Sequence, residues 1–271
     1  MSPRTGALVR IACAAVEHVF VQTSAGPFGF IGRLHTDRRR PSLLAVNGSF
    51  PQKDYLHDLP DAFPGANVLM VHVPGMGKTP WSGRSAADLT IGLQEAVSLL
   101  FRDLPLVVFS ASTGNLLALG LTNPNICRRV CVEPFFQTER LWPFIDYARG
   151  ELERHPKDAG KAQFLWDFFG ITPDRLENRD YRHLLDCVTQ PTDVVCGSVL
   201  LGEPPDDREV IWPSFTLAEE REALAANPLV TLHPSPPGFG HAVAHFQPGK
   251  NLVNRLNHGA LRAAAELCLP V

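Results

Sequence analysis

The chain has 271 residues, of which 45% are hydrophobic and 20% are charged, so it can bury one substantial core without division into two domains. Its formal net charge of −3 gives no overall field that would favour binding to nucleic acid or to an anionic membrane. We therefore expect one domain over residues 1–271, with neither nucleic acid nor membrane as a partner, and the sequence holds no signal for an oligomeric state.

The cysteines mostly lie inside apolar runs and form neither a Cys-x-x-Cys pair nor a cysteine–histidine pattern, which predicts buried, reduced thiols and no metal site. They are Cys13, Cys127, Cys131, Cys187, Cys196 and Cys268. Only a short apolar run separates Arg4 from Arg10, which fits neither a signal peptide nor a membrane span. A cytoplasmic protein is the expectation.

Apolar runs and turn residues divide the chain into short elements. The β-rich runs Val16–Gln22 and Phe28–Leu34 flank a turn-forming Ser-Ala-Gly-Pro segment and predict antiparallel strands at one side of a sheet. Helical stretches then alternate with compact apolar runs, at Leu43–Val46, Val68–Val73, Leu104–Phe109, Val130–Glu133, Val194–Leu201 and Leu229–Leu232. This alternation predicts right-handed βαβ crossovers and a parallel sheet.

The clearest helix runs from about Ser85 to Arg102, where Ser85 and Asp88 have the spacing of a capping box and apolar residues recur with helical period. Further helices are predicted over Leu217–Ala226 and Leu252–Leu267. Between about Phe135 and Gln190 the alternation stops, and short amphipathic segments rich in aromatic residues predict an inserted helical region.

The run Leu106–Phe109 leads directly into Ser110-Ala111-Ser112-Thr113-Gly114, and an apolar helix is predicted over Asn115–Leu121. Small residues two before and two after the central serine let a strand reverse sharply into a helix, which leaves Ser112 strained and exposed at the sheet edge. The N-terminus of the following helix favours a developing negative charge. The motif alone also fits a helix-capping serine, but its place between a buried strand and a helix favours a nucleophile.

A second series of motifs resembles the α/β-hydrolase superfamily: Ser42–Gly48, a helix after Pro51, Asn67–Pro74, and then the glycine-rich segment Gly75–Thr79. The resemblance implies the α/β-hydrolase fold, with a mostly parallel central sheet and helices on both faces. In that superfamily the first turn is usually His-Gly followed by the oxyanion residue. Here Asn47 replaces the histidine, while Gly48 and Ser49 keep the other two places. By resemblance, the backbone N–H groups of Ser49 and Thr113 form the oxyanion hole.

Gly77-Lys78-Thr79 after a strand also looks like the end of a phosphate-binding loop. The full pattern requires a glycine five residues before Gly77, where this sequence has His72. We therefore expect no nucleotide site and no cofactor, and the resemblance gives this loop a structural role.

In this superfamily the catalytic base is a histidine on a loop after the last strand. Gly238-Phe239-Gly240-His241 falls there, so His241 is the expected base and His245 is the alternative. The acid should follow the strand Val194–Leu201, where the first choice is Asp206, with Asp207 and Glu203 as neighbouring alternatives. A known variation places the acid after the sixth strand instead, and Glu133 occupies that point.

The resemblance implies a serine hydrolase that cleaves an ester or thioester of a small, largely apolar molecule through an acyl-enzyme on Ser112. Insertions after the sixth strand lie above the catalytic edge in this fold, so residues 137–190 are expected to form a small helical cap. Four aromatic residues of the cap are expected to bind substrate, unless they only pack the cap onto the sheet: Trp142, Phe144, Trp166 and Phe169.

Two other functions stay open. The same fold hosts lyases, cyclases and cofactor-free oxygenases, so the fold alone does not specify hydrolysis. A non-catalytic binding protein could also retain the serine turn, because Ser110 and Asn47 both depart from the common pattern.

Overall fold

The computed structural model describes residues 8–13, 16–35, 40–48, 58–72, 84–139, 141, 149–150, 153–154, 159–172, 174–200, 213–241, 243–245 and 247–268. The strands in chain order are β1 (Leu8–Cys13), β2 (Val16–Thr23), β3 (Gly26–Arg33), β4 (Ser42–Val46), β5 (Asn67–His72), β6 (Leu106–Ala111), β7 (Ile126–Val132), β8 (Thr192–Cys196) and β9 (Val230–Pro234). The α-helices are α1 (Leu59–Ala62), α2 (Ala86–Leu100), α3 (Gly114–Ala118), α5 (Ala159–Phe169), α6 (Ala218–Ala226) and α7 (Gln247–Glu266), and 3-10 helices cover η2 (Arg182–Cys187) and η3 (Val243–His245).

All of the strands in the described residues join one sheet, in the order β1-β2-β3-β5-β4-β6-β7-β8-β9. The first three pair antiparallel with their neighbours, and β4 to β9 pair parallel, as the alternation of elements predicted. Strand β1 was not predicted, because Arg10 interrupts its apolar run. It nevertheless pairs with β2 along its whole length, from Leu8 opposite Val21 to Cys13 opposite Val16.

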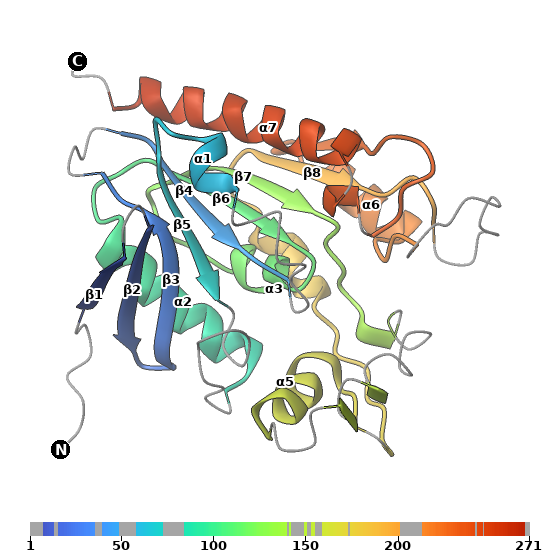
Figure 1. Ribbon diagram of the computed structural model, residues 1–271. Helices are drawn as coiled ribbons and strands as arrows, with labels where there is room; N and C mark the ends of the chain where they lie inside the picture. Colours follow the sequence, from blue (N-terminus) through green and yellow to red (C-terminus); the bar gives the residue numbers. More distant parts are fainter. Residues whose placement is uncertain are drawn as a thin grey trace.

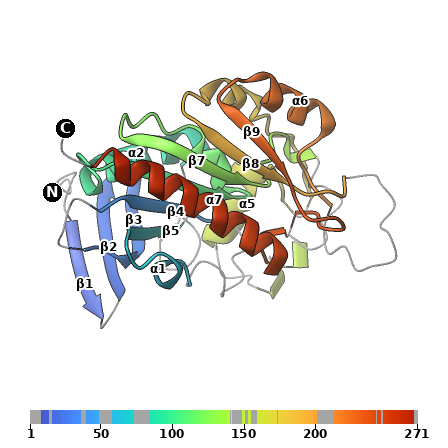
Figure 2. The ribbon, with the colours of Figure 1, turned by 90° about the horizontal axis from the view of Figure 1, so that it is seen from above.

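Helices cover both faces of the sheet because alternate residues of its buried strands point to opposite sides. In β4, Leu44 and Val46 join the core beneath α2 and α3, whereas Leu43 and Ala45 join the core beneath α1 and α7. Figures 1 and 2 show α7 lying across one face and α2 with α3 lying on the other. The predicted capping box of α2 is present, since Ser85 Oγ accepts from the Asp88 N–H and the Asp88 carboxylate accepts from the Ser85 N–H.

The carboxyl ends of the parallel strands meet at one edge of the sheet. The residues that follow β4, β6 and β7 there are Asn47, Ser112 and Glu133, and the loop after β9 brings His241 to the same edge. Figure 1 shows α5, from the inserted segment, beyond the arrowheads of β4 and β5. Side chains from distant parts of the sequence therefore converge at this edge. No helix among the described residues is long and apolar enough to cross a bilayer.

Candidate active site

Ser112 occupies a sharp turn between β6 and α3. Its φ of 52° lies in the left-handed region, which a residue with a side chain seldom adopts. Two backbone hydrogen bonds hold the turn: the Ser112 N–H donates to Val132 O at 3.0 Å, and the Asn115 N–H donates to Ser112 O at 2.9 Å. The hydroxyl of Ser112 is thereby presented at the sheet edge, as the motif predicted.

The small residues on either side of Ser112 are explained by different contacts. A Cβ at Gly114 would lie 2.1 Å from Val46 O, so only glycine allows the start of α3 to pack against the end of β4. The side chain of Ser110 is fully buried, and its hydroxyl donates to Asn115 Oδ1 at 2.6 Å. Ser110 departs from the common pattern, and its hydroxyl provides the hydrogen-bond donor for the side-chain oxygen of Asn115.

Asn115 connects the turn at Ser112 with the turn at Glu133. Its Nδ2 donates to the carbonyl oxygens of Ser112 and Val132, each at 2.9 Å, and its side chain is fully buried. Glu133, which follows Val132, has a φ of 50° and is the only other non-glycine residue with a positive φ in the described part of the chain. The side-chain amide of Asn115 therefore stabilises both strained turns.

His241 lies between the side chains of Ser112 and Glu133. Its Nε2 is 2.8 Å from Ser112 Oγ, and its Nδ1 is 3.2 Å from Glu133 Oε2. The Glu133 side chain is 1% exposed and that of His241 is 14% exposed, so the pair is largely shielded from water. A carboxylate can only accept, so Nδ1 carries the proton and Nε2 presents its lone pair to the serine hydroxyl.

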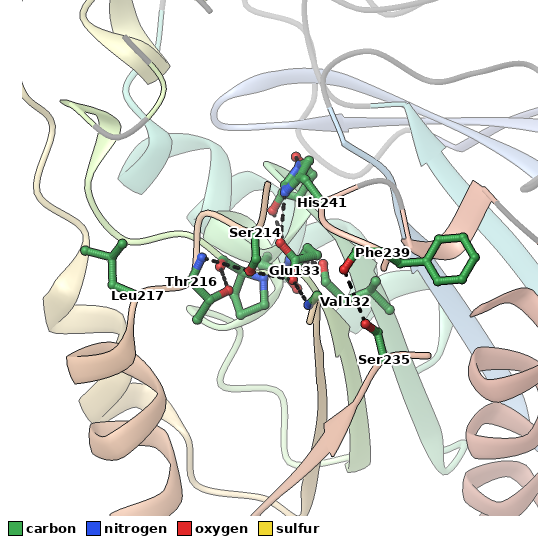
Figure 3. A network of polar contacts seen from close by, with 12 residues as sticks. Val132, Glu133, Ser214, Thr216, Leu217, Ser235, Phe239 and His241 are labelled. Carbon is green, nitrogen blue, oxygen red and sulfur yellow. Dashed lines mark hydrogen bonds and ion pairs between the residues drawn. The ribbon is translucent and has the colours of Figure 1, made fainter. Parts of the chain in front are cut away.

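The buried Glu133 carboxylate has other donors besides His241. Its Oε1 accepts a hydrogen bond from the Gly197 N–H. The same oxygen accepts from the Ser214 hydroxyl at 2.8 Å (Figure 3). The ring of Phe215 packs against His241 with 4.6 Å between the ring centroids. Nearby, burial and then the charge of Glu133 raise the pKa of Cys196 to about 12, so this thiol stays protonated at neutral pH.

The carboxylate that contacts His241 is the alternative made on sequence, not the first choice. Asp206, Asp207 and Glu203 lie outside the described residues, whereas the carboxylate in contact with Nδ1 of His241 belongs to Glu133, the alternative after the sixth strand of the superfamily pattern. The reason is the left-handed turn at Glu133, which directs its side chain toward the loop of His241. The alternative base, His245, lies in η3, four residues beyond the histidine that contacts Ser112.

The predicted oxyanion turn lies directly beside the serine. A Cβ at Gly48 would be 3.0 Å from Ser112 Cβ, so glycine allows this close approach. Asn47, in the usual histidine place, accepts a hydrogen bond from the Gly48 N–H through Oδ1 at 2.8 Å. Thr113 follows Ser112 and is buried, while Ser49 lies outside the described residues, as does the glycine-rich segment Gly75–Thr79.

The predicted substrate-binding aromatics divide into two groups. Trp142 and Phe144 lie outside the described residues. The Trp166 ring has the guanidinium groups of Arg175 and Arg179 over it, each 4.7 Å from the ring centroid. Phe169 is 5% exposed and stacks on Phe135 at 6.0 Å. Packing accounts for these contacts of Trp166 and Phe169, and contact with a substrate stays a prediction.

Sequence reasoning missed Ser214, which donates to Glu133, Phe215, which packs against His241, and Arg221, which donates to Ser214. Ser214 and Phe215 precede α6 and Arg221 lies within it, and no sequence motif marks these positions. Within the described residues, no group of three or more His, Cys, Asp or Glu side chains could hold a metal ion.

No protein-family model matches the sequence, and no curated protein matches it. Solved structures match almost the whole chain. An esterase from Pyrococcus furiosus shares 15% identity with a TM-score of 0.62, covering 98% of this chain and 100% of its own. An enol-lactonase from Burkholderia xenovorans LB400 shares 15% identity with a TM-score of 0.61, covering 90% and 99%. An α/β-hydrolase fold protein from Nakamurella multipartita shares 17% identity with a TM-score of 0.56, covering 91% and 99%. The chain therefore has the α/β-hydrolase fold, which confirms the prediction from its motifs.

Proposed function

We propose that this protein is a serine hydrolase that cleaves an ester or thioester through an acyl-enzyme on Ser112. The observation that carries the proposal is the line of contacts Ser112 Oγ to His241 Nε2 at 2.8 Å and His241 Nδ1 to Glu133 Oε2 at 3.2 Å. The first distance allows a proton to pass from the serine to the imidazole, and the second puts the carboxylate within hydrogen-bond distance of the imidazole. Esterases among proteins of the same fold add support.

In the proposed mechanism, Ser112 Oγ attacks the carbonyl carbon while His241 Nε2 takes its proton. Glu133 holds the imidazole in the reactive tautomer and stabilises the imidazolium that forms. His241 then protonates the leaving group, and a water molecule, deprotonated by the same nitrogen, cleaves the acyl-enzyme. Backbone N–H groups of Ser49 and Thr113 would stabilise the negative oxygen of each tetrahedral intermediate. The closeness of Gly48 to Ser112 supports this place for Ser49.

We also propose that residues 137–190 form a cap over Ser112 that selects a largely apolar acyl or aromatic group. The position of α5 beyond the carboxyl ends of β4 and β5 supports this (Figure 1). Covering an apolar substrate would contribute about 25 cal/mol per Å² of area removed from water.

Reaction with a fluorophosphonate probe tests the proposed function. We expect the full-length protein to gain the mass of one phosphonyl group, and peptide mass spectrometry should locate it on Ser112. Ser112→Ala should remain unlabelled. A folded protein that fails to label would indicate a binding protein, and turnover of a non-ester substrate without an acyl-enzyme would indicate another chemistry on this fold.

A further inference from the structure

The two oxygens of Glu133 have separate partners. Oε2 faces His241 Nδ1, whereas Oε1 accepts from the Gly197 N–H and from Ser214 Oγ. Ser214 is fully buried and Gly197 is buried as well, so both donors are removed from bulk water. Figure 3 shows Ser214 beside Glu133, with His241 next to the same carboxylate. The Oε1 side therefore anchors the carboxylate, and the Oε2 side is left for the histidine.

Arg221, in the first half of α6, contacts both residues that hold Oε1. Its Nη2 donates to Ser214 Oγ at 2.8 Å and to Gly197 O at 2.9 Å. Its Nε donates to Thr216 O at 2.9 Å. A single rigid guanidinium thus ties the segment before α6 to the end of β8, in a geometry that a flexible ammonium group cannot reproduce.

The contact with Arg221 also fixes the direction of the Ser214 proton. A serine hydroxyl has one proton to donate and two lone pairs that accept. Because Nη2 of Arg221 can only donate, Ser214 Oγ accepts from it, and the hydroxyl proton is left for Glu133 Oε1. The result is a chain of donors that runs from a permanent positive charge through one hydroxyl to the carboxylate.

We propose that Arg221 and Ser214 are positioning residues for Glu133. Arg221 orients the Ser214 hydroxyl, and Ser214 holds Oε1 so that Oε2 stays at Nδ1 of His241. This inference rests on the proposed function. Neither residue touches the reacting atoms, so their removal should slow the reaction of Ser112 without weakening the binding of substrate. The loss of a hydrogen bond to a charged group corresponds to a rate lower by about 10- to 100-fold.

The test compares Ser214→Ala, Arg221→Gln and the double variant in the full chain, with Arg221→Lys as a milder change. Two controls remove similar groups at the opposite, amino-terminal edge of the sheet. Ser42→Ala removes another fully buried hydroxyl, and Arg33→Gln removes another partly buried guanidinium that donates to a backbone carbonyl. The measurements are kcat and KM for p-nitrophenyl butyrate, the rate constant for labelling by a fluorophosphonate, and Tm.

We expect Ser214→Ala and Arg221→Gln each to lower kcat and the labelling rate by about 10- to 100-fold, with KM within about twofold of wild type. The double variant should be no more than about threefold slower than the slower single variant, because the two residues act in series. Arg221→Lys should recover part of the rate, and the controls should keep wild-type rates.

Wild-type rates in Ser214→Ala and Arg221→Gln, with or without a lower Tm, would overturn the inference, since the network would then serve only folding. Fully multiplicative effects in the double variant would overturn the action of Arg221 through Ser214. A wild-type protein that neither labels nor hydrolyses the ester would instead overturn the proposed function itself, together with this inference.

Discussion

The replacement Glu133→Gln tests the role of the carboxylate most directly, because it keeps the size of the side chain and removes its charge. The Gly197 N–H and the Ser214 hydroxyl both donate to Oε1, so the amide oxygen of the glutamine should take that place. Its NH₂ group then faces Nδ1 of His241, where Oε2 stood 3.2 Å away. An NH₂ donor requires Nδ1 to accept, which moves the imidazole proton to Nε2.

With its proton on Nε2, His241 cannot take the proton of Ser112, although the heavy atoms have hardly moved. We expect kcat to fall by about 10³- to 10⁴-fold, equivalent to about 4–5.5 kcal/mol of transition-state stabilisation, as for the wrong histidine tautomer in a Ser-His-Asp triad. The assay is the hydrolysis of p-nitrophenyl butyrate, with circular dichroism and Tm as checks on folding. KM should change little.

The matched control is Asp206→Asn, which neutralises the carboxylate that the sequence ranked first and should leave kcat within about twofold of wild type. The sequence alone predicted the opposite ranking. If Asp206→Asn lowers kcat more than Glu133→Gln does, the acid acts from the segment after β8, and the contact of Glu133 with His241 is not the one used in the reaction.

Ser112, Gly114 and the proposed cap can each be tested by substitution. Ser112→Ala should abolish ester hydrolysis while leaving Tm within a few degrees of wild type, and a variant that keeps more than about a tenth of the wild-type kcat would contradict the role of the hydroxyl. Gly114→Ala should lower the free energy of unfolding by about 1–3 kcal/mol and Tm by several degrees, because the new Cβ would lie 2.1 Å from Val46 O. The control is Gly65→Ala, where a Cβ would meet nothing within 4 Å. Equal Tm values for the two variants would refute the reasoning. If the proposed cap binds substrate, kcat/KM should rise with the acyl chain length of the ester until the space beneath the cap is full, and Trp142→Ala and Phe169→Ala should change that dependence. If kcat/KM does not depend on chain length, the cap has a packing role only. The same conclusion follows if the two variants lose stability but keep the wild-type dependence.

Local patterns in the sequence determined much of the fold. The apolar runs predicted the parallel strands, and the capping box predicted the start of α2, because both depend on residues that are neighbours along the chain. The turn at Ser112 and the loop of His241 were also predicted, since each follows a strand that the sequence marks clearly. Strand β1 was missed because Arg10 interrupts its apolar run, although the strand pairs with β2 along its whole length.

Only the tertiary structure decided which carboxylate contacts the histidine. Glu133 and Asp206 both follow predicted strands, and the sequence cannot tell which one turns toward His241. The choice depends on the left-handed backbone at Glu133 and on donors from Gly197 and Ser214, which lie 64 and 81 residues further along the chain. Such contacts arise only when the strand ends meet at one edge of the sheet, so no local motif records Ser214 or Arg221. The turn that presents Ser112, the proposed nucleophile, is therefore encoded locally, whereas the contacts that hold Glu133 beside His241 arise only in the folded chain.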